Sequence, residues 1–278
     1  MWPFVERLAM VVVGATALGI AIYLLGSFTL MRAYAPPRPL GLTGRAFVRE
    51  AMWVILTQPL LPFFYFVGRR MGRFGSRPGE AVVPVVLVHG YMHNRVGFLG
   101  LARALAKRRP APLVAINDPW YASVPDNAQR LARFVAEVVR ATGAREVDLV
   151  CHSMGGVVAL EMLRAAAVGE LAPAPPVRRC VTVASPHGGV VWRGPMLGEG
   201  AQNLRRGSAL LAKHTEAITI PCLSIYSTHD NVVPKETSHL ERRGGRDLEI
   251  PEVGHLSILF DRRVADAITT FLDEDAAA

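Results

Sequence analysis

Residues 146 to 160, EVDLVCHSMGGVVAL, contain the pattern that most restricts how this chain can fold. An apolar run ends at Cys151 and His152, Ser153 and two glycines follow at once, and apolar residues then resume at helical spacing. Such a sequence predicts a buried strand joined directly to a helix. A turn of this kind lies at the carboxyl edge of a parallel sheet, where ligands bind. Ser153 is therefore the first candidate for a functional side chain.

The chain from residue 80 to 278 alternates β-branched apolar runs with segments of helical periodicity. We expect strands at 82–88, 112–117, 146–151, 178–184, 220–226 and 247–251. We expect helices at 96–109, 126–142, 155–167 and 257–273. This alternation predicts one α/β catalytic domain in which helices cover both faces of a mostly parallel sheet.

Ser153 lies in C-H-S-M-G-G, which matches the nucleophile elbow G-x-S-x-G except that Cys151 replaces the first glycine. A serine hydroxyl is a weak nucleophile until a base takes its proton, so an acid and a histidine are expected later in the chain. Asp230 ends the strand-like LSIYSTHD, and His255 follows the next strand. We expect Asp230 to orient His255, and His255 to accept the proton of Ser153.

The first expected strand ends in VVLVHGYMHNR, which supplies candidates for binding the oxyanion. A tight turn at Gly90 would aim the backbone N–H of Tyr91 at that oxygen, and the N–H of Met154 would be the second donor. Because both donors are backbone groups, the side chains of Tyr91 and Met92 are expected to line an acyl pocket.

Five motifs occur in order at predicted strand ends: HGY, HSMGG, SPHGG, HDNVVP and GH. With them, residues 82 to 273 resemble the α/β-hydrolases, and within these the bacterial triacylglycerol lipases and esterases. The resemblance implies hydrolysis of carboxylic esters through an acyl-enzyme on Ser153, without a cofactor. The histidines at 89, 93, 152 and 187 show no zinc-type spacing with a third ligand, and phosphate-loop and dinucleotide fingerprints are missing from the sequence.

Four further polar residues near the predicted strand ends need separate interpretation. His152 neighbours the nucleophile, but we expect its side chain to point away and to support the structure. His187 either contacts substrate or is a hydrogen-bonded loop histidine. His229 adjoins Asp230 and points away from it in an extended segment. Asp118, in NDPWY, is either a loop cap or an alternative acid.

Residues 188 to 216 form a connection longer than most, and such a length favours a cap over the active site. The alternative is an ordinary crossover helix with a long loop. A cap would need an apolar inner face, for which the candidates are Trp192, Met196, Leu197, Leu204, Leu210 and Leu211. Met92, His187 and Trp192 are then candidate pocket residues.

Residues 1 to 79 are expected to form a membrane anchor and an interfacial segment. Residues 8 to 31 carry no charge and are long enough, as a helix, to span the hydrocarbon layer of about 30 Å once. A cleaved signal peptide is the alternative, because Arg7 precedes the run and AYA at 33–35 resembles a cleavage site. Residues 51 to 68 are uncharged but interrupted by prolines, so they predict either an interfacial segment or a buried flap on the catalytic domain.

Positive charge is concentrated in the same region, where nine arginines face two glutamates. These arginines flank apolar segments, which favours anionic lipid headgroups over nucleic acid as their partner. If only residues 8–31 span, the charge bias favours a cytoplasmic catalytic domain; if both segments span, the bias no longer discriminates. Cys151, Cys180 and Cys222 each fall in an expected core strand, so no disulfide framework is implied.

Three functions remain open at this point. The first is a membrane-anchored serine esterase or lipase acting on acylglycerols or related lipid esters. The second is an acyltransferase that uses the same acyl-enzyme. The third is a catalytically silent scaffold that binds a membrane partner, which the intact Ser153, Asp230 and His255 argue against. Acyl chain length, the membrane face and the oligomeric state are not determined by the sequence.

Overall fold

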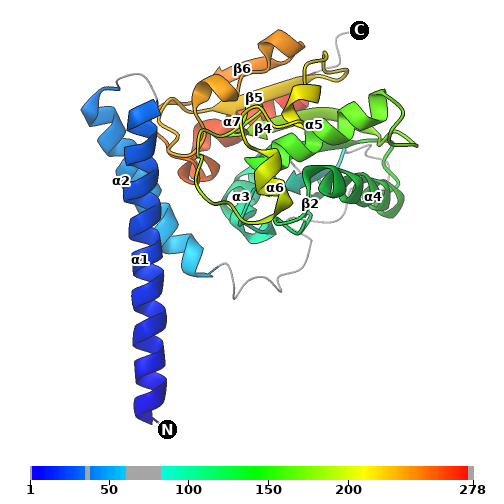
Figure 1. Cartoon of the computed structure of the whole chain (residues 1–278). Coiled ribbons are helices and arrows are strands. Elements are labelled where there is room, and N and C mark those ends of the chain that lie inside the picture. The colour runs from blue at the N-terminus through cyan, green and yellow to red at the C-terminus, as the bar shows by residue number, and fades with distance from the viewer. Residues whose placement is uncertain (1, 35–37, 61–82, 110, 275–278) are drawn as a thin grey trace.

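The computed structural model describes residues 2–34, 38–60, 83–109 and 111–274, and these contain a six-stranded sheet (Figure 1). Its strands are β1 (Val85–Val88), β2 (Leu113–Ala115), β3 (Val147–His152), β4 (Val177–Val183), β5 (Cys222–Tyr226) and β6 (Arg246–Glu249). Their order is β2-β1-β3-β4-β5-β6, and every neighbouring pair is parallel. The expected parallel sheet is confirmed, with each strand close to its predicted place.

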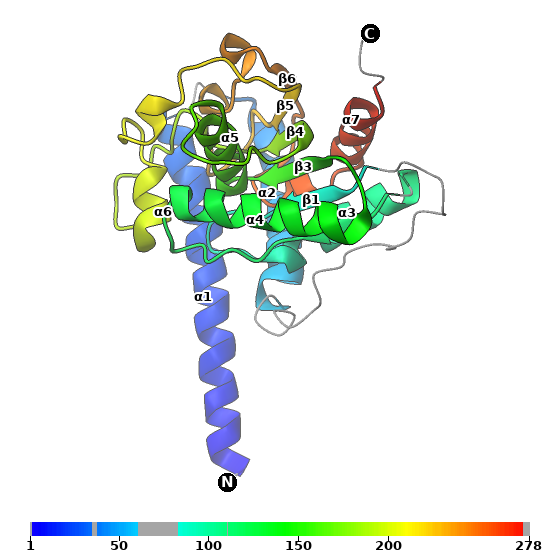
Figure 2. The same cartoon turned by 90° about the vertical axis from the view of Figure 1, so that its right-hand side faces the viewer.

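Helices cover both faces of the sheet, as predicted. The four that do so are α3 (Leu99–Arg108), α4 (Val124–Thr142), α5 (Met154–Ala167) and α7 (Arg262–Asp273). Helices α4 and α5 cover one face of the sheet, and α3 and α7 cover the other (Figure 2). Their apolar side chains pack with the strands in two separate core clusters. Short 3-10 turns, η3 (Arg95–Phe98) and η7 (Ser257–Phe260), form the first residues of two of the expected helices.

Local signals explain where these helices begin and end. The Ser123 side chain accepts the N–H of Asp126 at the start of α4, and Gly143 closes that helix with a left-handed φ of 70°. Asp261 caps α7 in the same way by accepting the N–H of Arg263. Each cap satisfies a backbone group that the helix cannot satisfy itself, so the helix boundaries are encoded in the sequence.

The strand order reverses between β1 and β3, and this reversal positions the site. Connections from these two strands leave toward opposite faces of the sheet, which opens a crevice at their carboxyl ends. Val88 pairs with Cys151 at that edge. The residues that follow them, from His89 and from His152, therefore lie side by side at the place where ligands bind.

The long connection between β4 and β5 contains α6 (Gly198–Asn203) and the 3-10 turn η4 (Leu211–Lys213). Of its expected inner face, Leu204 and Leu210 are buried and Met196 and Leu211 are partly buried against the core. Trp192 and Leu197 are instead 45% and 65% exposed, so these two residues do not pack on the core. Trp192 turns back on its own loop and donates its Nε1–H to the carbonyl of Pro195.

Two N-terminal helices stand beside this domain: α1 (Trp2–Tyr34) and α2 (Leu40–Thr57), the latter followed by the 3-10 turn η1 (Gln58–Leu60). In Figure 1 the first part of α1 projects away from the rest of the molecule, and its later part lies beside α2. Within the described residues, one helix, Phe4–Tyr34, is long and apolar enough to cross a membrane. The same length and composition also occur in signal sequences and in core helices.

The later part of α1 packs on other parts of the protein, whereas Phe4–Gly19 is almost entirely exposed. Buried or half-buried side chains recur at helical spacing from Ile20 onward, namely Ile20, Tyr23, Leu24, Ser27, Phe28, Leu30 and Met31. Phe28 contacts Phe47 of α2 edge to face, with ring centroids 5.2 Å apart. The apolar helix thus has a free first half and a second half joined to the folded domain.

Helix α2 rests on the catalytic domain. The Trp53 ring stacks on Phe260 at 3.9 Å between centroids, and Val54 is buried. Met52, Ile55 and Leu56 on the same helix are exposed, so the interfacial and flap interpretations both stay predictions. Residues 61–68 lie outside the described part. The helix ends at Thr57, directly before Gln58 and Pro59.

The arginines of this region have protein partners. Arg38 donates to the carbonyl oxygen of Asp230, Arg45 pairs with Glu252, and Arg49 pairs with Asp261. Arg45 and Arg49 remain exposed despite these contacts, so the interaction of the basic region with lipid headgroups stays a prediction. The second basic cluster, residues 69–77, lies outside the described part.

Candidate active site

Ser153 occupies the predicted sharp turn between β3 and α5. Its φ of 52° and ψ of −125° lie outside the regions favoured by L-residues, so its backbone is strained. The turn is possible because its neighbours lack bulk. A Cβ on Gly155 would lie 2.3 Å from the carbonyl oxygen of Val88, and one on Gly156 would lie 2.2 Å from Ser185 Oγ. Cys151, in place of the first elbow glycine, fits with its side chain completely buried.

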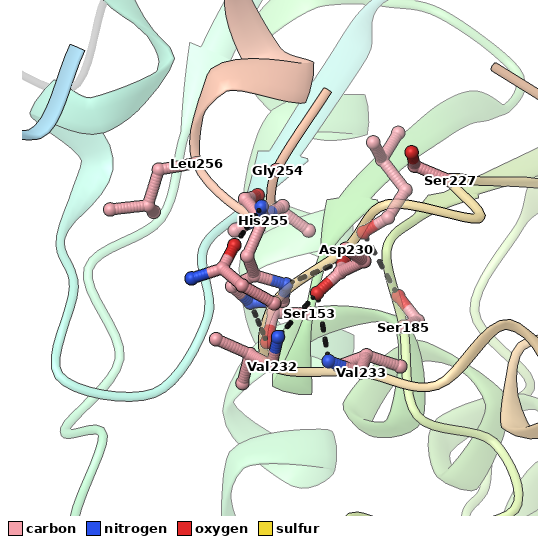
Figure 3. A network of polar contacts seen from close by, with 12 residues as sticks. Ser153, Ser185, Ser227, Asp230, Val232, Val233, Gly254, His255 and Leu256 are labelled. Carbon is pink, nitrogen blue, oxygen red and sulfur yellow. Dashed lines mark hydrogen bonds and ion pairs between the residues drawn. The ribbon is translucent and has the colours of Figure 1, made fainter. Parts of the chain in front are cut away.

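The structure brings Ser153, His255 and Asp230 together in one hydrogen-bonded chain (Figure 3). Ser153 Oγ lies 3.0 Å from His255 Nε2, and His255 Nδ1 lies 2.9 Å from Asp230 Oδ2. With Nδ1 protonated by its bond to the carboxylate, Nε2 is left as the acceptor for the serine proton. This is the arrangement that activates a serine hydroxyl as a nucleophile.

The Asp230 carboxylate is held on both oxygens. While Oδ2 contacts His255, Oδ1 accepts the N–H groups of Val232 and Val233 at 2.7 and 2.8 Å (Figure 3). The residue is 1% exposed. Its orientation toward the imidazole is therefore set by the turn that follows β5.

His255 has a pKa above its ordinary value. Burial by itself lowers the pKa of the imidazole, but the charge of Asp230, its hydrogen bond and the charge of Glu50 outweigh burial. A raised pKa means that the imidazolium is stabilised, which is what a base needs after it has taken a proton.

The backbone around His255 is held by side chains outside the hydrogen-bonded chain, of which Asn231 and Glu50 were not predicted from the sequence. Asn231 Oδ1 accepts the N–H of His255, and His152 Nε2–H donates to the carbonyl of His255 at 3.0 Å. Burial lowers the pKa of His152 well below its usual range, so this ring is neutral. The expected supporting role of His152 agrees with this contact. Glu50 of α2 accepts the N–H groups of the next two residues.

The two residues expected to supply the oxyanion donors both adjoin the nucleophile turn. Gly90 approaches Ser153 so closely that a Cβ on it would lie 2.7 Å from Ser153 Cβ, and Tyr91 comes next in the chain. Met154 begins α5, so its N–H has no partner within the helix. In the described part of the chain, no backbone hydrogen bond outside the helices and strands uses the N–H of Tyr91 or of Met154.

The candidate pocket residues lie in different surroundings. Met92 is 59% exposed beside the turn, with a left-handed φ of 51°. His187 is buried, its Nε2 lies 3.0 Å from Thr182 Oγ1, and burial lowers its pKa to about 3. These contacts favour the loop-histidine alternative for His187. The Tyr91 hydroxyl bonds the backbone N–H and carbonyl of Leu197, which joins the long β4–β5 connection to the turn after β1.

Two further residues take no part in the hydrogen-bonded chain. His229 Nδ1 accepts the N–H of Glu252, as expected for a neighbour pointing away from the triad. Asp118 lies in a separate cavity of about 320 Å³ with Arg130 and Arg133. Burial raises the pKa of Asp118 to about 7, against the opposing effect of these arginines. Among the described residues, no group of three or more His, Cys, Asp or Glu side chains is placed to hold a metal ion.

A known protein family covers the part of the chain that carries these residues. The family model described as "Alpha/beta hydrolase family" matches residues 85–267, which include all three residues of the hydrogen-bonded chain. The chain belongs to the alpha/beta hydrolase family. A segment of 87 residues, 30% of the chain, is also 40% identical to pyochelin synthetase PchF of Pseudomonas aeruginosa. The match spans only 5% of the length of that curated relative.

Solved alpha/beta hydrolase-like structures show the same fold at low sequence identity. The mature lipase BlEst2 of Bacillus licheniformis is 17% identical, with a TM-score of 0.57 over 72% of this chain and 96% of that chain. Aspergillus fumigatus lipase B is 16% identical, with a TM-score of 0.60 over 71% of this chain and 53% of that one. A lipase-esterase related protein from Clostridium acetobutylicum is 16% identical, with a TM-score of 0.54 over 73% and 97% of the two chains.

Proposed function

We propose that this alpha/beta hydrolase cleaves carboxylic esters through an acyl-enzyme on Ser153. The observation that carries the proposal is the continuous contact from Ser153 Oγ through His255 to Asp230, at 3.0 and 2.9 Å. A nucleophile, a base and an orienting acid in hydrogen-bond reach of one another are the minimum requirement for this chemistry. The lipases and esterases among the structural neighbours support esters as the substrate class.

The reaction follows from the positions of these atoms. Ser153 Oγ attacks the ester carbonyl while His255 Nε2 takes its proton, and the N–H groups of Tyr91 and Met154 stabilise the oxyanion. When the tetrahedral intermediate collapses, His255 gives that proton to the leaving alcohol, and the acyl group stays on Ser153. Water then attacks the acyl-enzyme in the same way, which releases the carboxylic acid and restores the serine.

The proposal extends to lipid esters and a membrane location. Helix α1 presents an exposed apolar surface over Leu8–Gly19, which is unfavourable in water and favourable in a bilayer. Two exposed apolar side chains also lie near the candidate site, those of Met92 and Leu197. Met92 follows Tyr91 in the chain, and the Leu197 carbonyl accepts the Tyr91 hydroxyl. An apolar rim suits an acyl chain, and an anchor in the bilayer would keep the site near such substrates. In this account α1 inserts its first half, and the catalytic domain of residues 80–278 rests on the lipid surface.

Hydrolysis of a graded ester series by the detergent-solubilised full chain tests the catalytic part. p-Nitrophenyl esters and triacylglycerols of short to long acyl chain are compared for the wild type and Ser153→Ala. We expect the variant to lose roughly three to six orders of magnitude in rate. The preferred chain length then separates an esterase from a lipase. Product partition with an added alcohol acceptor tests the acyltransferase alternative, and equal rates for the two proteins would leave the scaffold as the better account.

Carbonate extraction of membranes from cells that produce the full chain tests the location. An inserted helix keeps the protein in the membrane fraction, and N-terminal sequencing of that fraction is expected to show α1 still attached. Release by carbonate, or a mature chain that begins after residue 34, would contradict the anchor and favour the signal peptide.

A further inference from the structure

Glu50 is a buried carboxylate in a region that is mostly apolar and basic. It lies on α2, is 0% exposed, and is one of only two acidic residues in the first 79. A buried charge is costly unless its oxygens are satisfied by donors, so its partners indicate why it is there. The mechanism proposed above makes no use of this residue.

Every contact of Glu50 in the described residues is with a donor. Oε1 accepts the hydroxyl of Tyr23 from α1 at 2.8 Å and the N–H of Leu256 at 2.9 Å. Oε2 accepts the N–H of Ser257 at 2.7 Å. Burial raises the pKa of Glu50, and its hydrogen bonds to Ser257, Leu256 and Tyr23 oppose that rise. Two of these partners are backbone N–H groups, which can only donate and therefore favour the ionised carboxylate.

These contacts fall on the loop that carries His255. Leu256 and Ser257 directly follow the histidine, and Gly254 precedes it. A Cβ on Gly254 would lie 2.6 Å from Glu50 Oε2. The carboxylate therefore lies against the residue before His255 as well as the two residues after it. Together with Asn231 on the His255 N–H, side chains hold three successive backbone N–H groups.

The first helix takes part through two hydroxyl groups. Besides the Tyr23 bond to Glu50, Ser27 Oγ accepts the side-chain N–H of Asn231 at 2.8 Å. Asn231 is the residue that binds the His255 N–H. Two routes therefore lead from α1 to the backbone of His255, one through Glu50 and one through Asn231.

We propose that Glu50 is a positioning residue for His255, and that α1 and α2 thereby form part of the support of the active site. This inference rests on the proposed role of His255 as the base for Ser153. The role of Glu50 is to hold the loop at residues 254–257 so that Nε2 stays within hydrogen-bond reach of the serine. Loss of this support is expected to lower turnover, because small displacements of a reacting group are costly.

The charge of Glu50 also bears on the protonation of His255. Asp230 faces the imidazole on one side, and Glu50 contributes a second negative charge that raises the pKa of His255. His152 and His93 are the other titratable groups nearby; the His152 and His255 ring centroids are 4.8 Å apart. Burial lowers the pKa of both neighbours, to about 3 for His93, so they add no positive charge near neutral pH.

The test compares Glu50→Gln with Arg45→Gln in the detergent-solubilised full chain. Active sites are first titrated with a fluorophosphonate, so that rates refer to folded protein. For E50Q we expect kcat to fall by about 10- to 100-fold while KM stays within about threefold. We also expect the acidic limb of its kcat/KM profile to move to lower pH, because a charge that raises the pKa of His255 is lost. R45Q removes an exposed α2 contact with Glu252 and is expected to match the wild type.

A residue with a merely structural role would lower only the unfolding temperature. An E50Q protein that keeps the wild-type kcat and the wild-type acidic limb would therefore overturn the proposal, even if it is less stable. If E50Q yields no folded protein, Tyr23→Phe takes its place. It removes one donor to the carboxylate, and we expect a severalfold lower kcat with unchanged KM; an unchanged kcat would overturn the proposal. Failure of the proposed function is distinct, since it appears as equal activity of wild type and Ser153→Ala.

Discussion

Asp230 Oδ2 lies 2.9 Å from His255 Nδ1, and the other oxygen of the same carboxylate is fixed by two backbone N–H groups of its own turn. The carboxylate therefore cannot rotate away from the imidazole without breaking bonds at both oxygens. This relationship determines the tautomer of His255 and leaves Nε2 facing Ser153.

Asp230→Asn is expected to preserve the fold and lower kcat by about 10³- to 10⁴-fold. The amide is nearly the same size as the carboxylate, but an NH₂ group turned toward Nδ1 favours the wrong tautomer of His255. Ester hydrolysis and the far-ultraviolet circular dichroism spectrum of the variant check this. A folded D230N with a rate within tenfold of wild type would show that Asp230 does not orient the base.

The pH dependence of kcat/KM follows from the raised pKa of His255. The base must be neutral to accept the serine proton, so the rate falls as pH drops through its pKa. Because Asp230 and Glu50 outweigh burial, we expect this acidic limb above the value of about 6.5 typical of a free imidazole. Rates on an uncharged ester between about pH 5 and pH 9 would measure it. An acidic limb well below the pKa of a free imidazole would mean that burial outweighs the charges of Asp230 and Glu50.

Gly155→Ala is expected to destabilise the domain by about 3 kcal/mol or more, since its Cβ would lie 2.3 Å from the backbone carbonyl of Val88. A backbone atom in a central strand cannot move aside. The matched control is Gly44→Ala in α2, where a Cβ meets nothing within 4 Å. That change is expected to be neutral or to stabilise by about 0.5–1 kcal/mol. Thermal unfolding compares the two, and similar midpoints would contradict the close contact at the elbow.

Glu161 joins α5 to the end of the long β4–β5 connection, because its carboxylate binds both Arg164 and His214. Burial raises the pKa of Glu161, but these two partners more than offset it and bring the pKa to about 2. A depressed pKa adds stability above the unfolded value of about 4.3, and that stability is lost as pH falls toward 2.

Glu161→Gln is therefore expected to lower the free energy of unfolding at neutral pH by about 3 kcal/mol, since a buried pair loses one partner. The difference from wild type should shrink in acid. Glu170→Gln removes an exposed partner of the same Arg164, and we expect a much smaller loss, because water screens an exposed ion pair. Unfolding midpoints at neutral and acidic pH test both. Equal losses in the two variants would contradict the burial of the Glu161 site.

The sheet and the elbow were predictable because their signals are local. Apolar runs bounded by polar turns marked each strand, and the serine between a strand and two glycines marked the nucleophile turn. Asp230 and His255 could be chosen as well, since parallel strands end at one edge of the sheet. That edge brings Ser153 to within 3.0 Å of a residue 102 positions later.

The N-terminal contacts could not be predicted in the same way. Whether Arg38 binds a lipid phosphate or the carbonyl of Asp230 depends on how α2 packs on the domain. The periodicity of the sequence does not encode that packing. Trp192 was a candidate for the apolar inner face of the cap, and its indole N–H donates to the carbonyl of Pro195 in its own loop. Glu50 could not be selected from the sequence either, because acidic side chains are mostly exposed and only the packing of α2 shows that this one is buried.

The most direct test of the account is covalent labelling of the solubilised full chain with a fluorophosphonate, followed by peptide mass mapping. Such a reagent reacts with an activated serine hydroxyl and mimics the tetrahedral intermediate. We predict one phosphonate per chain, located on Ser153, with no labelling of Ser153→Ala and much slower labelling of His255→Ala. Labelling at another residue, or ester hydrolysis that persists in a protein whose Ser153 stays unmodified, would contradict the assignment of Ser153 as the nucleophile.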